Sequence, residues 1–420
     1  MKLFFSSVQW ALFILMSSVI VPITLSELYD FSFEESIDFV QRTLFVLGLA
    51  GLLHVLFGHK LPIQEGPTNL WWAIFIFFAS TGTTLFSNYT ETLNVLQSGL
   101  LISGVVFLIF SLTKGLRLIE KLMTPTILAV YLILLVVQLS GTFIKGLMGI
   151  TETSNSIDLL ILLLSIILIA LNYYISTFKY IKQYSVLITI IVGWTVFFVL
   201  GLTTPMQSVD TIFNIPTITS LTKIDLYPSI IPLIIGVTLL LMMNMIVTIQ
   251  VVQKVYDNHN QMYLQCSQRN AGIVSGINQI LAGLFSTVGP VPISGTASFI
   301  ESTKQFLRLP FIIGSLLVVI VSFFPVFISF IVTIPPPVGY AAIFPVFSNM
   351  LVLAMDLLYA VAARARMYKI LSISLFTGIG IMFVQIDSFI NISPTIVPLA
   401  SNGLVVGTLL SFILEVSLRK

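Results

Sequence analysis

Charged residues are scarce in this sequence, and their scarcity excludes most classes of soluble protein. Asp, Glu, Lys and Arg make up 9% of the 420 residues, whereas hydrophobic residues make up 57%. In an average soluble domain, roughly a quarter of the residues are charged. The formal net charge is only +2, so the chain has no basic excess of the kind that binds nucleic acid. The composition predicts a polytopic membrane protein without a nucleic-acid partner.

Cysteine and histidine are also scarce. The single cysteine, Cys266, excludes a disulfide within the chain. The three histidines, His54, His59 and His259, show no spacing typical of metal ligands. The sequence contains no phosphate-binding loop, nucleophile elbow or zinc motif. We therefore expect a protein that is not an enzyme or an ATP-driven pump, and that uses no metal or other cofactor.

Long apolar runs dominate the rest of the sequence. Runs such as residues 159–171 and 231–249 are continuous and do not alternate at period two, which favours helices over a β-barrel. Apolar windows of about 20 residues, the length that crosses a bilayer, predict fourteen segments. The first seven lie at 5–25, 41–58, 62–80, 93–112, 124–143, 157–176 and 185–204. The second seven lie at 229–252, 270–286, 291–306, 310–333, 337–359, 369–386 and 395–417.

The distribution of basic residues predicts the orientation of these segments. With the N-terminus in the cytoplasm, all but three of the 19 Lys and Arg residues fall on the cytoplasmic side, as the positive-inside rule requires. The first outer loop is acidic and contains Glu34, Glu35 and Asp38. We expect a multi-pass protein of the cell membrane with both termini in the cytoplasm. Since each half has seven spans, the halves have opposite orientations and form a 7+7 inverted repeat.

Two short stretches interrupt the apolar pattern at corresponding places in the two halves. Residues 61–69 read Leu-Pro-Ile-Gln-Glu-Gly-Pro-Thr-Asn, and residues 291–298 read Val-Pro-Ile-Ser-Gly-Thr-Ala-Ser. Proline and glycine disfavour a continuous helix, so each stretch predicts extended backbone followed by a new helix. Such broken segments, here the third and tenth, mark the binding site in many transporters.

Glu65 is the ionisable residue that these segments place inside the membrane. An intramembrane carboxylate is costly, and it marks a substrate or ion pathway by default. We therefore expect Glu65 to bind substrate and to carry a coupling proton. The alternative is that Glu65 lies nearer the cytoplasmic end and pairs with Lys60 or His59.

Other polar residues near the two interruptions are candidates for contact with a planar, hydrogen-bonding solute. Asn244 lies at the middle of the eighth segment and can both donate and accept hydrogen bonds in one plane. The candidate substrate-binding residues are Gln64, Glu65, Thr68, Asn244, Gly295, Thr296 and Ser298. The alternative is that these groups only satisfy backbone groups freed at the breaks, or join helices to one another.

Five stretches along the chain resemble the nucleobase/ascorbate transporter family, which includes uracil and xanthine permeases. They are residues 7–10, 19–22, 61–69, 289–298 and 334–339. The resemblance implies a core formed by residues 1–113 and 228–334 and a gate formed by residues 123–205 and 335–420. It also implies short strands in the third and tenth segments, a substrate between core and gate, and a homodimer.

This sequence departs from the family pattern at the two acidic positions. The resemblance aligns the substrate-binding Glu of the eighth segment with Asn244 and that of the tenth with Thr296. We therefore expect a symporter for a nucleobase, either uracil or a purine such as xanthine, coupled to protons or sodium. The alternatives are an anion transporter or exchanger of the same fold, and a channel or a sensor that does not transport.

Overall fold

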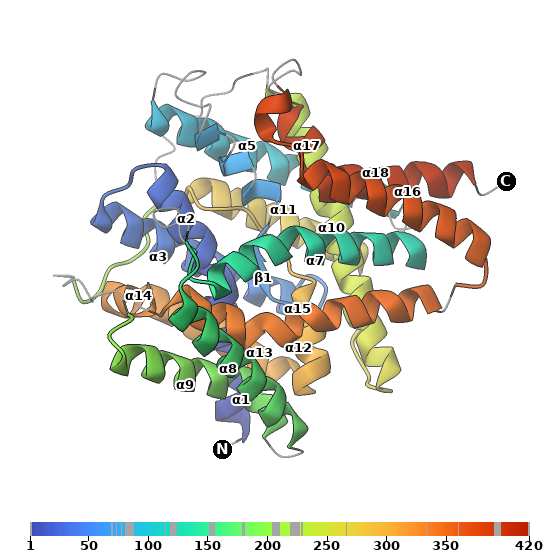
Figure 1. The fold of residues 1–420 in the computed structure, drawn as a ribbon. Helices are drawn as coiled ribbons and strands as arrows, with labels where there is room; N and C mark the ends of the chain where they lie inside the picture. Colours follow the sequence, from blue (N-terminus) through green and yellow to red (C-terminus); the bar gives the residue numbers. More distant parts are fainter. Residues whose placement is uncertain are drawn as a thin grey trace.

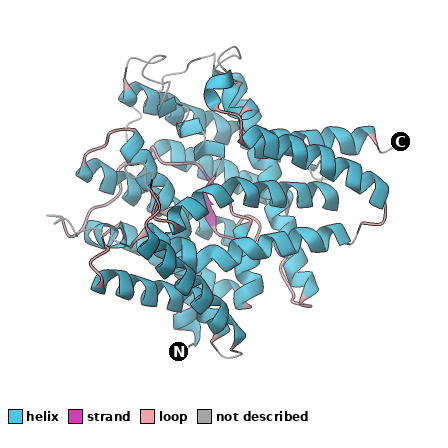
Figure 2. Cartoon of the chain, viewed as in Figure 1, coloured by secondary structure: helices cyan, strands magenta, loops and turns pink. Residues whose placement is uncertain are grey.

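The computed structural model describes residues 2–68, 70–72, 74–76, 78–79, 88–113, 115–117, 124–150, 156–178, 181–203, 211–218, 227, 230–265, 267–332, 334–359, 361–389 and 396–418 (Figure 1). Helices dominate the described residues, and two short strands lie among them (Figure 2). The N-terminal half contains α1 (Lys2–Ser18), α2 (Ile20–Leu28), α3 (Phe33–Leu56), β1 (Glu65–Pro67), α5 (Tyr89–Leu112), α7 (Pro125–Leu147), α8 (Leu159–Thr177) and α9 (Ser185–Val199). The C-terminal half contains α10 (Ile231–Asn258), α11 (Gln268–Leu284), β2 (Pro290–Pro292), α12 (Gly295–Thr303), α13 (Arg308–Ser322), α14 (Pro325–Val332), α15 (Pro336–Tyr359), α16 (Arg364–Met382), α17 (Val397–Ala400) and α18 (Gly403–Ser417).

Among the described residues, 7 helices are long and apolar enough to cross a membrane. Three shorter apolar helices, α9, α13 and α18, accompany them. The prediction of a mostly helical, multi-pass membrane protein is confirmed. The count of fourteen segments stays a prediction, as does the position of the termini.

The acidic stretch predicted as the first outer loop is partly helical. Helix α3 begins at Phe33, so Glu34, Glu35 and Asp38 lie in its first turns. The side chain of Ser32 accepts from the backbone N–H of Glu35, whose carboxylate accepts from the backbone N–H of Ser32. This capping box satisfies two amide groups at the helix start, which explains why the helix extends beyond the apolar window.

The two strands pair antiparallel at the centre of the molecule (Figure 2). Glu65 lies opposite Pro292, and Pro67 lies opposite Pro290. Prolines in both stretches prevent a regular helix, and the backbone groups left without helical partners bond across the pair. The pair joins segments that are far apart in sequence, and a new helix, α12, starts at Gly295, directly after the second strand.

Helices pack mainly within two groups. In the first, α5 packs on α11, and α13 packs on both α1 and α3. In the second, α15 packs on α7 and α8, and α16 packs on α18. These groups fall in the residue ranges predicted for the core and the gate, and the division into those two moving parts stays a prediction.

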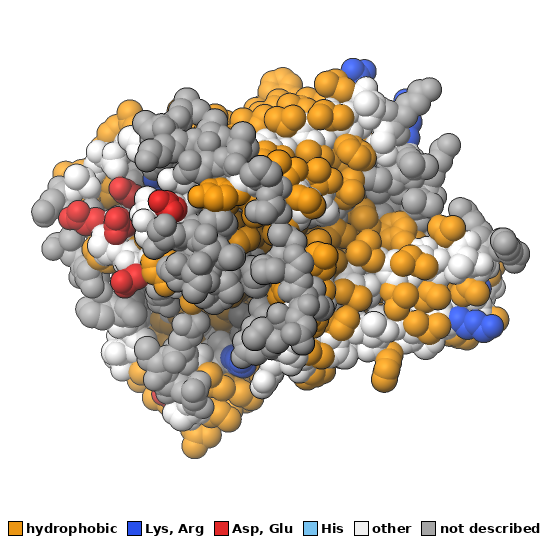
Figure 3. All heavy atoms as spheres, turned by 90° about the horizontal axis from the view of Figure 1, so that it is seen from above, with side chains coloured by type: hydrophobic (Ala, Val, Ile, Leu, Met, Phe, Trp, Pro, Cys, Tyr) orange, Lys and Arg blue, Asp and Glu red, His pale blue; other side chains and the backbone are white. Residues whose placement is uncertain are grey.

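Much of the surface of the molecule consists of exposed hydrophobic side chains. Figure 3 shows hydrophobic side chains over much of the visible face, with acidic side chains gathered at one end and basic side chains visible at the other. Helix α8 illustrates the pattern, because Leu159, Leu163 and Ile166 are each more than half exposed. Side chains of this kind are stable on a surface that lipid covers.

Candidate functional site

Strand β2 is held in place by polar side chains from α10 and α11. The amide nitrogen of Asn244 and the hydroxyl of Thr248 both donate to the carbonyl oxygen of Pro292, each at 3.2 Å. The amide of Gln279 donates to the carbonyl oxygen of Pro290 at 2.7 Å, and its oxygen accepts from the indole N–H of Trp71 at 3.1 Å. Two helices therefore supply the donors that the proline-rich strand needs.

Replacing Gln279 with alanine should destabilise the protein without touching the pocket described below. The change removes two buried hydrogen bonds and leaves the Trp71 indole N–H and the Pro290 carbonyl without these partners, at a cost of about 2–4 kcal/mol. The thermal midpoint of the purified protein should fall by several degrees. Gln261→Ala is the matched control, because that side chain is exposed in a loop and should leave the midpoint unchanged. Equal midpoints for the two variants would contradict this role of Gln279.

A pocket lies beside the strand pair, between residues of the two helix groups. It encloses about 130 Å³ and is lined by α1, β1, β2 and α10 on one side and by α7, α15 and α18 on the other. Among the described residues, no lining side chain is charged. The polar lining side chains are Ser17, Thr68, Trp72, Tyr131, Asn244, Ser294, Tyr340 and Thr408.

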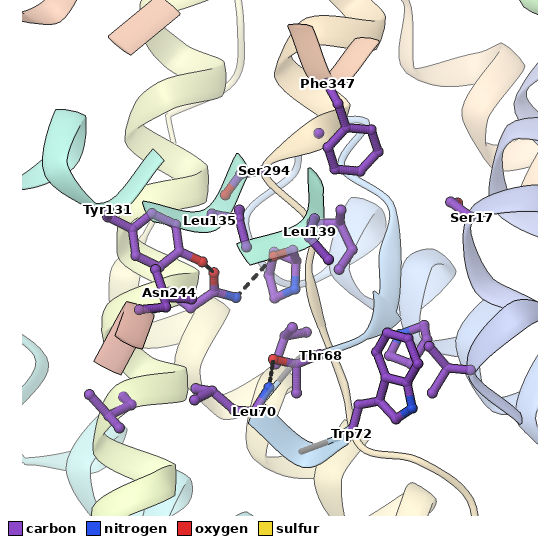
Figure 4. A pocket seen from close by; sticks show the side chains of 18 of the residues that line it. Ser17, Thr68, Leu70, Trp72, Tyr131, Leu135, Leu139, Asn244, Ser294 and Phe347 are labelled. Carbon is purple, nitrogen blue, oxygen red and sulfur yellow. Dashed lines mark hydrogen bonds between the residues drawn. The ribbon is translucent and has the colours of Figure 1, made fainter. Parts of the chain in front are cut away.

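Asn244 is the polar centre of this pocket. Its oxygen Oδ1 accepts from the hydroxyl of Tyr131, while its nitrogen donates to Pro292 (Figure 4). Figure 4 shows the phenol of Tyr131 directed at the amide, with Trp72 on another wall of the pocket. Tyr131 belongs to α7 of the second helix group, and Asn244 belongs to α10, which packs on α5 of the first group, so this hydrogen bond joins the two groups.

Aromatic side chains form much of the remaining wall. The ring of Phe143 lies 4.8 Å from that of Tyr340 and 4.4 Å from that of Phe347, measured between centroids. The buried indole N–H of Trp72 and the buried hydroxyl of Thr408 have no hydrogen-bond partner among the described residues. Because burying a polar group without a partner is costly, these two groups are suited to bond a solute.

Three of the predicted substrate-binding residues line the pocket, and four do not. Thr68, Asn244 and Gly295 are lining residues. Gln64 is buried behind the wall and donates to the hydroxyl of Ser17, which does line it. Thr296 accepts from the backbone N–H of Gln64 at 3.2 Å and so connects the two interrupted stretches. Ser298 and Glu65 are buried away from the pocket; Asn69 lies outside the described residues.

Glu65 lies instead beside His54 and His59. Oxygen Oε1 of Glu65 is 3.8 Å from Nε2 of His54 and 3.7 Å from Nε2 of His59, and all three side chains are buried. The spacing of the histidines along the chain gave no sign of this cluster, in which the rings of His54 and His59 lie against each other. The alternative noted for Glu65, a pairing with His59, agrees with this geometry better than contact with substrate does.

The sequence analysis also missed Trp72, Tyr131 and Phe347 as lining residues. Trp72 lies three residues after the broken third stretch. A large aromatic residue next to such an interruption indicates a wall of a binding site. Tyr131 and Phe347 lie inside long apolar segments, where an aromatic residue is equally typical of helix packing. The hydrogen-bond partner of Tyr131, Asn244, lies 113 residues away along the chain, so no local pattern could identify that contact.

Comparison with known proteins shows what this chain is similar to. It matches the Permease family over residues 1–386. It is 37% identical over 414 residues to "Putative purine permease YwdJ" of Bacillus subtilis (strain 168), which covers 97% of this chain and 94% of that protein. It is 27% identical over 129 residues to nucleobase-ascorbate transporter 12 of Arabidopsis thaliana, which covers 30% of this chain and 18% of that protein.

Solved structures with the same fold are far more distant in sequence. The transmembrane domain of the cyanobacterial bicarbonate transporter BicA has a TM-score of 0.56 at 12% identity, covering 98% of this chain and 97% of that one. The murine anion transporter Slc26a9, in its inward-facing state, has a TM-score of 0.62 at 11% identity, covering 99% of this chain and 68% of that one. At such identities the likeness concerns the fold alone.

Proposed function

Because this chain belongs to the permease family that includes the nucleobase/ascorbate transporters, and is a transporter and not an enzyme, we propose that it carries a nucleobase across the cell membrane. The solute is a purine such as xanthine, or else uracil, and it moves together with a proton. The family relationship and the purine permease of Bacillus subtilis support this class of solute.

The pocket carries the proposal. Its volume of about 130 Å³ is close to that of an engineered cavity of about 150 Å³ that binds benzene, so it suits one small planar ring system. Asn244 offers the second N–H and the second lone pair of its planar amide, and Trp72 offers an N–H that has no partner among the described residues. Together these groups match the alternating N–H and C=O groups of a base edge. The aromatic wall of Phe143, Tyr340 and Phe347 suits the faces of such a ring.

An anion is the second candidate solute, because the bicarbonate transporter BicA and the anion transporter Slc26a9 share this fold. The pocket argues against it. A cationic side chain would favour an anion inside a membrane, and the described lining residues include neither Lys nor Arg. A neutral base needs only hydrogen bonds and contact with apolar groups.

The wider arrangement follows from the family resemblance and the distribution of charge. We propose fourteen spans in a 7+7 inverted repeat, with both termini in the cytoplasm, a core that moves against a gate, and a homodimer as the assembly. Thr68, Asn244 and Gly295 contact the solute, while Gln64 and Thr296 join the two interrupted stretches behind the pocket wall. Sodium is the alternative coupling ion.

Binding and uptake measurements test the proposed solute. Purified protein is tested for thermal stabilisation by xanthine, guanine and uracil, and by bicarbonate and sulfate as the competing class. Proteoliposomes are then tested for uptake of the labelled base that stabilises most. We expect one base to stabilise the protein and to show saturable uptake that the unlabelled base inhibits. Stabilisation by an anion alone, with no uptake of any base, would overturn the proposal.

A further inference from the structure

Three titratable side chains converge at a buried point outside the pocket. His54 lies in the last turns of α3, His59 in the turn that follows, and Glu65 in β1. The backbone N–H groups of Gly58 and Lys60 both donate to the carbonyl oxygen of His54, and this closed turn brings His59 onto His54. Lys60 then adopts a positive φ of 61° as the chain leaves the turn. The two imidazole rings stack, with centroids 4.5 Å apart and planes at 12°. We call these three residues the histidine–glutamate cluster.

The cluster contains acceptors and donors that no other group satisfies. Both carboxylate oxygens of Glu65 and Nε2 of His59 lack a hydrogen-bond partner among the described residues, although all three side chains are at most 1% exposed. Nδ1 of His59 accepts from the backbone N–H of Leu61 at 3.2 Å, which assigns the proton of a neutral ring to Nε2, facing Glu65. Nε2 of His54 faces both Glu65 and the hydroxyl of Ser275, which lies 3.2 Å away.

A proton suits this arrangement better than a metal ion. The donor atoms lie within 4.8 Å of one another, which is close enough for a metal by distance alone. A metal bound by imidazole, however, lies in the plane of each ring, along the nitrogen lone pair. Stacked rings with nearly parallel planes have no such common point. A proton shared between Glu65 and a histidine requires only that one pair of atoms close from 3.7 Å to hydrogen-bond distance.

Electrostatics limit the cluster to one extra proton. A buried carboxylate without a donor is strongly destabilising, and one proton on the cluster either neutralises it or pairs it with an imidazolium. A second proton would leave a net positive charge beside Arg308 at the start of α13, which acts electrostatically on His59. The proton therefore belongs to the cluster as a whole.

The cluster is connected to the pocket through the strand pair. Glu65 lies opposite Pro292 in the antiparallel pairing. The carbonyl oxygen of Pro292 accepts from Asn244, the polar centre of the pocket, and Thr68 lines the pocket three residues after Glu65. A change of charge at Glu65 therefore acts on the pair of strands β1 and β2. Residues of both strands line the solute pocket.

We propose that His54, His59 and Glu65 form the coupling-proton site of this transporter, separate from the solute pocket and connected to it through β1 and β2. This inference rests on the proposed transport of a base. It differs from the sequence-based expectation, in which Glu65 binds solute and proton at once. Base binding and proton coupling should therefore be separable by substitution.

The test uses the full chain in proteoliposomes with an entrapped pH dye. In wild type, we expect an acid-outside gradient to drive accumulation of the base, with proton entry that depends on the base. Glu65→Gln should still bind the base in a thermal-shift assay, but its accumulation ratio should fall to about one and the proton signal should disappear. His59→Gln, which also removes a titratable group, provides the same test if Glu65→Gln does not fold. His259→Gln, a histidine paired with Glu301 outside the cluster, is the matched control and should keep coupling.

The other outcomes contradict either the proton site or the transport function on which it rests. Base-driven proton entry that persists in Glu65→Gln would remove the cluster from coupling. Base uptake by wild type without proton entry would do the same. Stabilisation of wild type by micromolar Zn²⁺, reversed by a chelator and absent in Glu65→Gln, would identify a metal site instead. If no base binds to any variant, it is the proposed function that fails, and not the location of the proton site.

Discussion

Replacing Asn244 with alanine is expected to raise the dissociation constant for the transported base by about a hundredfold. Beside its bonds to Tyr131 and Pro292, the amide keeps one oxygen lone pair and one N–H for the solute. Losing two such hydrogen bonds costs about 3 kcal/mol when the solute groups stay desolvated. The expected result is a large loss of thermal stabilisation by the base, together with a matching rise in the base concentration needed for half-maximal uptake.

Thr248→Val is the control that distinguishes loss of a solute contact from loss of support for strand β2. Thr248 lies one turn along α10 and donates to the same Pro292 carbonyl, but it does not line the pocket. Its replacement should lower protein stability modestly and change base affinity by less than about tenfold. If the two variants lose equal affinity, Asn244 acts by holding β2 in place, and its assignment as a solute contact is wrong.

Replacing Gly104 with leucine is expected to remove most of the folded protein. A Cβ atom at Gly104 would lie 2.5 Å from the side chain of Ile280 and 2.7 Å from the carbonyl oxygen of Gly276, so the backbones of α5 and α11 are in direct contact. Small residues permit this close approach between membrane helices. A leucine must push the helices apart, at a cost of about 3 kcal/mol or more.

Size-exclusion chromatography of the expressed variants measures this effect. The monodisperse fraction of Gly104→Leu should be several times smaller than that of wild type. Gly141→Leu is the matched control, because Gly141 lies on an exposed face of α7 with nothing within 4 Å of an added Cβ. Equal yields of the two leucine variants would show that the contact between α5 and α11 is not essential.

The sequence was most informative where the physical cause is local. Proline and glycine within residues 61–69 and 291–298 predicted interrupted helices, because these residue types disfavour a helix wherever they occur. An asparagine at mid-span predicted a polar contact, since such a residue is costly inside a membrane. These two rules led to Thr68, Asn244 and Gly295, which line the pocket.

The sequence was least informative where partners come from distant helices. Tyr131 lies in an ordinary apolar segment, and its hydrogen bond to Asn244 spans 113 residues of chain. The proximity of His54 to His59 depends on a chain reversal at the end of α3, which the backbone N–H groups of Gly58 and Lys60 close on the carbonyl oxygen of His54. Without that reversal, the two histidines look unrelated, and Glu65 looks like a group facing the solute.

The hydrogen bond from Tyr131 to Asn244 uses one of the two lone pairs of the amide oxygen. An N–H group of the solute can therefore bond the same oxygen while the phenol stays in place. Because Tyr131 belongs to α7 and Asn244 to α10, a solute held at this oxygen lies at the contact between these two helices. A relative movement that separates α7 from α10 would therefore open the site around the solute.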